Sequence, residues 1–213
     1  MKIAVLGGTG SLGKGLVLRL ASLGYDVIVG SRDEKKANSK AEEYGRILGT
    51  DIRGADNRNA AKMCDMAIIT IPWKHAFDTA ESLKDVLAGK IVVSPVVPME
   101  KTDKGFVYVS LPEGSAAERL ASILKESRIV SAYHNIPAKK FADLNAEFEW
   151  DVAVCGDDED AKEVVMGITN EIKGLRALDA GGLSNSRIVE SLTPLLINIA
   201  VNNGMRDLGV KFV

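Results

Sequence analysis

The stretch Lys2-Ile3-Ala4-Val5-Leu6-Gly7-Gly8-Thr9-Gly10-Ser11-Leu12-Gly13 decides the fold of this chain. An apolar strand from Lys2 to Leu6 leads into a glycine-rich turn, and a helical pattern follows from Leu12 to Leu23. The spacing Gly8-x-Gly10-x-x-Gly13 is typical of a turn that binds the pyrophosphate of a dinucleotide. Its first two glycines allow a tight turn and close approach of backbone N–H groups, and its third lets the helix pack on the strand. The helix N-terminus adds a positive field, so the sequence predicts a Rossmann-type nucleotide site.

The end of the second strand indicates which dinucleotide binds. That strand is expected from Asp26 to Gly30, and Ser31 and Arg32 follow it. An NAD-selective site would carry Asp or Glu here to accept hydrogen bonds from the ribose, and a carboxylate would repel a 2′-phosphate. Arg32 offers a planar fork of donors, Ser31 a hydroxyl and Lys36 a further charge about one turn on. The sequence therefore predicts NADP.

Short apolar runs alternate with helical patterns along the whole chain, which predicts a doubly wound α/β fold with a mainly parallel sheet. The strands are expected at Lys2–Leu6, Asp26–Gly30, Met66–Ile71, Ile91–Ser94, Ile129–Ser131, Val152–Cys155 and Arg176–Asp179. The helices are expected at Leu12–Leu23, Glu34–Leu48, Asn57–Met63, Ala76–Leu87, Ser115–Lys125, Glu159–Ile172 and Asn185–Asn202. We expect an NADP-binding Rossmann domain over residues 1–150 and a smaller C-terminal part over 151–213, although the later strands could also extend the main sheet.

Three loops after strand ends should face the cofactor, because ligands of open α/β sheets bind outside the carboxyl ends of the strands. They are Ile71-Pro72-Trp73, Val96-Val97-Pro98 and Asn135-Ile136-Pro137-Ala138. All are mostly apolar, which suits flat aromatic rings better than a charged metabolite. Buried aliphatic residues at proline-rich loop starts would produce the same pattern.

The last helix carries apolar residues at helical spacing, with Pro194 in its middle. Proline inside a helix removes a hydrogen bond and should kink it. Three roles stay open for this helix: a core helix with a bend, a dimer face, or a wall of the substrate site. The apolar positions are Ile188, Leu192, Leu195, Leu196 and Ile199.

Composition excludes several other classes of protein. A formal charge of −2 and the absence of a polybasic patch argue against a nucleic-acid surface. No signal peptide and no membrane-spanning apolar run is visible, so we expect a cytoplasmic protein with no membrane partner. The two cysteines, Cys64 and Cys155, form no metal-binding pair. The acidic run from Asp157 to Asp160 is expected to cap a helix, and no metal is predicted.

The proton donors of common carbonyl reductases are missing. No tyrosine has a lysine four residues later, and the last helix has no lysine on its inner face. A phosphate-binding turn beside an apolar cleft favours hydride transfer between two flat cofactors, where positioning does most of the work.

Short motifs occur along the whole chain, at Gly7–Gly15, Val29–Arg32, Thr70–His75, Val92–Pro95, Cys155–Asp158, Leu183–Arg187, Glu190–Leu195, Asn203–Met205 and Leu208–Gly209. Together they resemble the archaeal coenzyme F420-dependent NADP oxidoreductases over essentially the whole chain. Enzymes of that family move a hydride reversibly between C5 of a reduced 8-hydroxy-5-deazaflavin and C4 of the nicotinamide, and they associate as homo-oligomers. The resemblance therefore implies NADP and coenzyme F420 as co-substrates and a homodimer or homotetramer.

The resemblance also implies site residues. The pyrophosphate would meet Thr9, Ser11 and Leu12 within the Gly8–Gly13 turn, and the 2′-phosphate would meet Ser31, Arg32 and Lys36. Ile71, Pro72, His75, Thr79 and Leu208 would complete the NADP site. The deazaflavin would lie among Val97, Pro137, Ala138, Asn185, Thr193 and Leu196. No residue is expected to supply chemistry of its own; His75, Val97 and Ala138 would position the rings at roughly 3 to 3.5 Å.

Two alternatives remain at this stage. One is an NADP-dependent reductase of a small imine or carbonyl compound, with His75 or a serine as proton donor. The other is a non-catalytic NADP sensor, because the Rossmann fold also occurs in such proteins. A second planar-ligand pocket would distinguish the hydride-transfer enzyme from the sensor.

Overall fold

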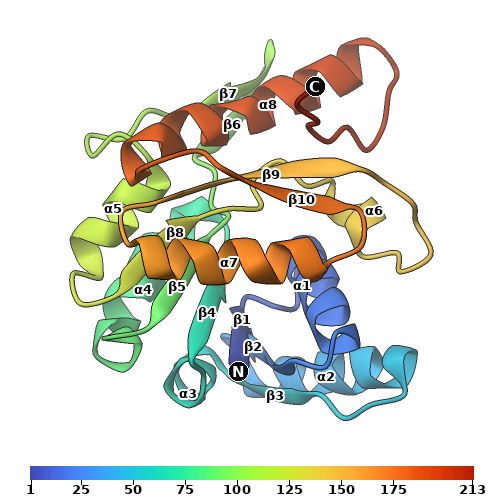
Figure 1. The fold of residues 1–213 in the computed structure, drawn as a ribbon, viewed down its shortest axis with the longest axis vertical. Coiled ribbons are helices and arrows are strands. Elements are labelled where there is room, and N and C mark those ends of the chain that lie inside the picture. Colours follow the sequence, from blue (N-terminus) through green and yellow to red (C-terminus); the bar gives the residue numbers. More distant parts are fainter.

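The computed structural model describes all 213 residues and has one eight-stranded sheet with helices on both faces (Figure 1). The strand order is β10-β9-β8-β5-β4-β1-β2-β3, with a separate two-stranded hairpin, β6-β7. The mainly parallel, doubly wound fold is thereby confirmed. The strands are β1 Lys2–Leu6, β2 Asp26–Ser31, β3 Arg53–Asp56, β4 Met66–Ile69, β5 Ile91–Ser94, β6 Met99–Thr102, β7 Gly105–Tyr108, β8 Arg128–Ser131, β9 Trp150–Gly156 and β10 Leu175–Asp179.

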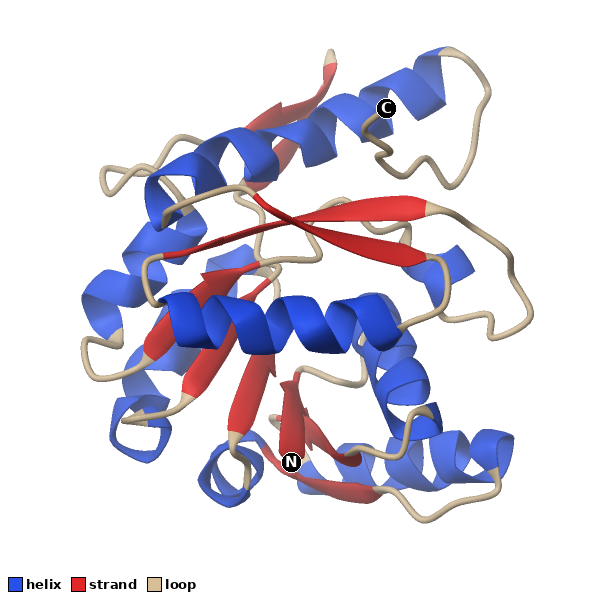
Figure 2. Ribbon diagram, in the orientation of Figure 1, coloured by secondary structure: helices blue, strands red, loops and turns tan.

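Helices cover both faces of the sheet (Figure 2), and a separate hydrophobic core lies on each face. One core of 28 buried residues takes its helical members from α1, α2 and α7 among others, and a second of 22 takes them mainly from α3, α4 and α5. Strands covered on both faces need apolar side chains, which is why the buried residues of β1, β4 and β5 are Ile, Val, Ala, Leu and Met, with Ser94 at the end of β5 as the exception. The helices are α1 Ser11–Ser22, α2 Glu34–Leu48, α3 Asn57–Met63, α4 Trp73–Leu87, α5 Ala116–Ile123, α6 Ala138–Phe141, α7 Glu159–Glu171 and α8 Ser186–Asn202, with a short 3₁₀ turn at Leu183–Asn185.

One junction of the sheet is antiparallel. Strand β9 runs against β8 and pairs with it only through Val130 with Gly156 and Ser131 with Cys155, whereas β10 is parallel to β9. Most of β9 therefore extends beyond the carboxyl end of β8, where α8 and the C-terminal segment lie (Figure 1). The sheet continues across residue 150, and the division into two domains there stays a prediction.

Four elements of the structure were not predicted from the sequence. Strand β3 reads Arg-Gly-Ala-Asp and β6 reads Met-Glu-Lys-Thr, so neither has the apolar run expected of a strand. Strand β7 and the single-turn helix α6 were also not expected. Several boundaries also differ by one to three residues, and two of them lie near the proposed site: β4 ends at Ile69, not Ile71, and α4 begins at Trp73, not Ala76. The earlier helix start places His75 in the first turn of α4.

The last helix, α8, is continuous from Ser186 to Asn202 with Pro194 inside it, and the predicted kink stays a prediction. It lies along the hairpin β6-β7 and next to the N-terminal end of α5 (Figure 1). None of the helices combines the length and the apolar character that crossing a bilayer requires.

Candidate nucleotide site and apolar pocket

The glycine turn after β1 is held together by its own backbone. Gly7 takes the left-handed conformation at φ +81°, the Gly8 N–H donates to Val5 O at 3.0 Å, and the Gly10 N–H donates to Gly7 O at 3.0 Å. A Cβ on Gly13 would lie 2.6 Å from the Cα of Gly8, so these two glycines let α1 pack on the turn. The left-handed residue is Gly7, which lies outside the Gly8-x-Gly10-x-x-Gly13 spacing.

Gly10 differs from the other glycines of the motif because the protein leaves room beside it. A Cβ there would meet only Gly7 O, at an ordinary contact distance of 3.5 Å. Gly10 is also the N-cap of α1, and no side chain caps this helix end. The N–H groups of Ser11, Leu12 and Gly13 therefore have no partner within the helix. An open helix N-terminus with a glycine in front of it fits the pyrophosphate of a dinucleotide.

Polar side chains that the sequence analysis did not select as site residues hold the turn and the end of β1, and two of them, Asn57 and Tyr44, are buried. Asn57, the first residue of α3, accepts from the Gly7 N–H at 3.4 Å through Oδ1. The Tyr44 hydroxyl of α2 donates to Gly8 O at 3.3 Å, and burial raises the pKa of Tyr44 to about 12. The Thr70 hydroxyl after β4 donates to Leu6 O at 2.9 Å. Of these residues, only Tyr44 could have been found from the sequence, because its hydroxyl lies on the apolar face of a predicted helix.

The residues expected to bind the 2′-phosphate lie at the end of β2 and the start of α2. Ser31 is buried and its Oγ accepts from the Asp33 N–H at 3.3 Å, while Arg32 and Lys36 are exposed and make no side-chain hydrogen bond. The adjacent carboxylate of Asp33 caps α2 by accepting from the Lys35 and Lys36 N–H groups. The side chains of Arg32 and Lys36 are therefore available to bind a phosphate beside the Ser31 hydroxyl.

The start of α4 borders the same turn. A Cβ on Gly7 would lie 3.0 Å from Cγ1 of Ile71, so Ile71 packs next to the phosphate-binding loop. Pro72 is the N-cap of α4, and the exposed imidazole of His75 follows in the first turn. The Thr79 hydroxyl donates to His75 O at 2.7 Å within the helix.

A second, apolar pocket lies between α8, the loop after β8 and the C-terminal segment. Its volume is about 410 Å³, and 8 of its 13 lining residues are hydrophobic. It brings together five predicted site residues from distant parts of the chain: Pro137, Ala138, Thr193, Leu196 and Leu208. Leu208, expected on the NADP side, thus lies with the predicted deazaflavin group. The remaining lining residues are Met99, His134, Asn135, Ile136, Ile197, Ala200, Val201 and Asp207.

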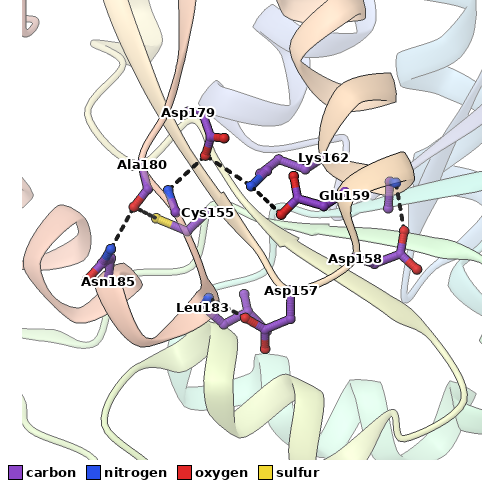
Figure 3. Close-up of polar contacts among 11 residues, drawn as sticks. Cys155, Asp157, Asp158, Glu159, Lys162, Asp179, Ala180, Leu183 and Asn185 are labelled. Atoms are coloured by element: carbon purple, nitrogen blue, oxygen red, sulfur yellow. Dashed lines mark hydrogen bonds and ion pairs between the residues drawn. The ribbon is translucent and has the colours of Figure 1, made fainter.

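Two predicted members of the deazaflavin group do not line this pocket. Val97 is half-buried in the loop between β5 and β6. Asn185 lies at the opposite end of α8, where its Nδ2 donates to Ala180 O at 2.7 Å (Figure 3). Their assignment to the deazaflavin site stays a prediction.

The acidic run before α7 caps that helix, as expected (Figure 3). Asp158 accepts from the Ala161 N–H at 2.8 Å, and Asp157 accepts from the Leu183 N–H at 2.9 Å. The buried Lys162 pairs with Glu159 at 2.9 Å and Asp179 at 3.1 Å. Structural contacts therefore engage these carboxylates, and no group of metal-ligating side chains occurs in the structure.

His134 is a pocket residue that the sequence analysis did not select. It is 6% exposed, its Nε2 lies 3.3 Å from the Ser131 hydroxyl, and its Nδ1 has no hydrogen-bond partner. Burial lowers the pKa of His134 to about 3, so the ring is neutral at physiological pH. The loop that carries His134 is also bound by α8, because the Thr193 hydroxyl donates to Asn135 Oδ1 at 2.9 Å and to His134 O at 3.0 Å.

These features define a class: a Rossmann-type dinucleotide-binding protein with an apolar pocket at the carboxyl edge of its sheet. The family model described as NADP oxidoreductase coenzyme F420-dependent matches residues 2–98. The F420-dependent NADP reductase of Methanocaldococcus jannaschii is 42% identical, with 99% of this chain and 97% of the relative covered. The enzyme of the same name from Methanothermobacter marburgensis is 40% identical over the same shares. The chain belongs to the family of F420-dependent NADP reductases.

A solved structure agrees with this fold. A protein from Arthrobacter sp. FB24, provisionally assigned as an F420-dependent NADP reductase, superposes with a TM-score of 0.86 at 24% identity. The match covers 100% of this chain and 99% of that one. It extends over β9, β10 and α8, the part of the chain that the family model does not reach.

Proposed function

We propose that this protein catalyses reversible hydride transfer between reduced coenzyme F420 and NADP. The observation that carries the proposal is the pairing of an open, glycine-fronted helix N-terminus with a pocket in which 8 of the 13 lining residues are hydrophobic. The first fits a dinucleotide pyrophosphate, and the second suits a planar ring system. The family to which the chain belongs supports the same reaction.

The chemistry belongs to the two rings. The hydride leaves C5 of the reduced deazaflavin and adds to C4 of the oxidised nicotinamide, and one proton is released as the deazaflavin is oxidised. The contribution of the protein is to bind, orient and exclude water. Such a reaction needs no proton donor at the hydride path, in keeping with a buried His134 whose lowered pKa keeps it neutral.

We assign the NADP site to the turn, the end of β2 and the start of α4. The N–H groups of the Gly8–Gly13 turn would bind the pyrophosphate, and Ser31, Arg32 and Lys36 the 2′-phosphate. The deazaflavin would occupy the apolar pocket, where Pro137, Ala138 and Leu196 supply apolar contact. Thr193 supports the loop of His134 and Asn135 rather than standing free as a donor.

The reaction is tested by following the deazaflavin absorbance band when NADP is added to enzyme and reduced coenzyme F420, with NAD as the control. Rapid reoxidation with NADP alone is the expected result. Reoxidation with either nucleotide would keep the reaction and contradict the specificity assigned to Ser31 and Arg32. Tight NADP binding without reoxidation would favour a small-molecule reductase or a sensor.

We further propose that the chain forms a homo-oligomer in the cytoplasm through the exposed side of α8. Ile188, Leu195 and Ile199 are 61%, 52% and 38% exposed, and no charged residue occurs from Ser191 to Asn202. Over Ser191–Asn202 a second copy presents the same uncharged surface, so pairing of these parts of the two helices leaves no charge unpaired. Light scattering should give a dimer or tetramer mass, and Leu195→Glu should give monomers; a monomeric wild type would contradict the proposal.

A further inference from the structure

The hairpin β6-β7 links the two halves of the proposed site. At one end it meets α4, because the Trp73 indole Nε1 donates to Met99 O at 3.0 Å. Trp73 is the first residue of α4, directly after Ile71 and Pro72. Met99 begins β6 and also lines the apolar pocket. The hairpin therefore starts where the two predicted cofactor sites meet.

At its other end the hairpin is joined to α8 by an amide. Asn198 Nδ2 donates to Phe106 O at 2.7 Å, and the Phe106 N–H donates to Asn198 Oδ1 at 2.8 Å. The side chain thus gives β7 the pair of hydrogen bonds that a neighbouring strand would supply. A Cβ on Gly105 would lie 2.6 Å from Asn198 Oδ1, so a glycine is needed for this approach.

A buried carboxylate makes a second connection about two helical turns earlier. Glu190 is fully buried and accepts from the Tyr108 hydroxyl of β7 at 3.0 Å. It also accepts from the N–H groups of Ala116 at 3.0 Å and Ala117 at 3.1 Å, at the N-terminus of α5. Two points of attachment hold the helix and the hairpin in one relative orientation.

We infer that the hairpin β6-β7 is a spacer that sets the position of α8 relative to the start of α4, with Asn198, Glu190 and Trp73 as its positioning residues. The inference rests on the proposed function. The pocket wall formed by Leu196, Ile197 and Ala200 belongs to the same helix as Asn198. If the hairpin shifts, that wall moves relative to the nucleotide site, and hydride transfer depends steeply on the resulting separation.

The test is Asn198→Ala, with Asn203→Ala as the matched control. Asn203 is exposed and its Nδ2 bonds only to Ile199 O of its own helix. Because a displacement of about 1 Å can cost on the order of 100-fold in rate, we expect single-turnover hydride transfer to fall about tenfold or more, with the NADP dissociation constant changed by about twofold at most. The control should match the wild type in both.

Hydrogen exchange of the segment 99–108 gives a second readout that does not depend on turnover. Asn198→Ala should speed exchange at the Phe106 N–H, which loses its acceptor. Trp73→Phe keeps an aromatic ring but removes the indole donor at the other end together with part of the ring volume, and it should slow hydride transfer without loss of NADP affinity. It also decides the question if Asn198→Ala does not fold.

Two outcomes would overturn the inference. One is faster exchange in the hairpin with an unchanged hydride-transfer rate, since the hairpin then does not control ring separation. The other is an equal loss of NADP affinity and rate, which indicates general damage to the fold. A wild-type chain without hydride transfer would overturn the proposed function and this inference together, whereas an active wild type with an unaffected Asn198→Ala overturns the inference alone.

Discussion

Gly13 and Gly8 touch: a Cβ on Gly13 would lie 2.6 Å from the Cα of Gly8, closer than side-chain carbons approach backbone atoms. The same substitution at Gly10 would meet nothing nearer than 3.5 Å. Two glycines of one motif therefore serve different purposes. Gly13 is required by the packing of α1 on the turn, whereas the space beside Gly10 is open, and we propose that the nucleotide occupies it.

The first prediction separates these two purposes. Gly13→Ala should destabilise the fold by about 1 to 3 kcal/mol, the usual range for overpacking. Gly10→Ala should cost only about 0.5 kcal/mol, because Ala is a poorer N-cap than Gly, and it should weaken NADP binding. Thermal unfolding and calorimetric titration with NADP measure the two effects. Equal stability loss in both variants would contradict the assignment of Gly10 to the ligand.

The second prediction concerns the choice of nucleotide. Arg32→Asp should weaken NADP binding by about 1.5 to 3 kcal/mol, the value of a hydrogen bond to a charged group, and leave NAD binding nearly unchanged. Titration of each nucleotide into the variant measures this. Arg46→Asp, at the far end of α2, is the control and should affect neither. If Arg32→Asp weakens both nucleotides equally, the 2′-phosphate contact is wrong.

The third prediction concerns the occupant of the apolar pocket. Ala200→Leu places a larger side chain in the pocket of about 410 Å³ and so leaves less room for a ligand. It should raise KM for reduced coenzyme F420 while leaving the NADP dissociation constant unchanged. Ala200→Ser, nearly the same size as the wild type, should retain the wild-type KM. A rise in the NADP dissociation constant with an unchanged KM for the deazaflavin would place the nucleotide in this pocket instead.

The fourth prediction uses the buried carboxylate of α8. Burial raises the pKa of Glu190 from 4.5 to about 7, so between these values the folded protein binds more protons than the unfolded chain. Its contribution to the free energy of unfolding therefore falls by about 3 kcal/mol as pH rises through that window. Glu190→Gln cannot titrate, and it should gain stability relative to the wild type from pH 4.5 to 7. Urea unfolding at several pH values measures the difference, and a constant difference would count against the raised pKa.

The fifth prediction concerns His134, whose effect on stability changes with pH in the opposite direction to that of Glu190. Burial lowers the pKa of His134 from 6.5 to about 3, so the unfolded chain binds more protons below pH 6.5. Stability is then complete above pH 6.5 and is lost as pH falls, by about 2 kcal/mol at pH 5. Because Glu190 opposes this trend, the wild-type curve is expected to be shallow, and His134→Asn should remove the loss on the acid side. Parallel curves for the variant and the wild type would contradict the buried neutral imidazole.

The sequence by itself determined the architecture, and it predicted the nucleotide half of the proposed site. The apolar strands, the glycine turn and the Ser31-Arg32 pair are local patterns, and local patterns depend on the spacing of neighbouring residues. Two of the four elements that it missed, β3 and β6, pair through their backbones and have no apolar run, so no hydrophobic periodicity marked them. Asn57 was missed for another reason, because its contact with Gly7 joins residues far apart in the chain.

Only the tertiary structure decided the composition of the apolar pocket and the connection between its walls. Leu208 and Pro137 meet there because β9 runs antiparallel to β8 and the C-terminal segment pairs with it through Asp151 N and Val210 O at 2.7 Å. Asn198 forms hydrogen bonds with the Phe106 backbone because α8 packs along the hairpin. Long-range pairing of this kind depends on strand direction and helix packing, and a single linear pattern carries neither.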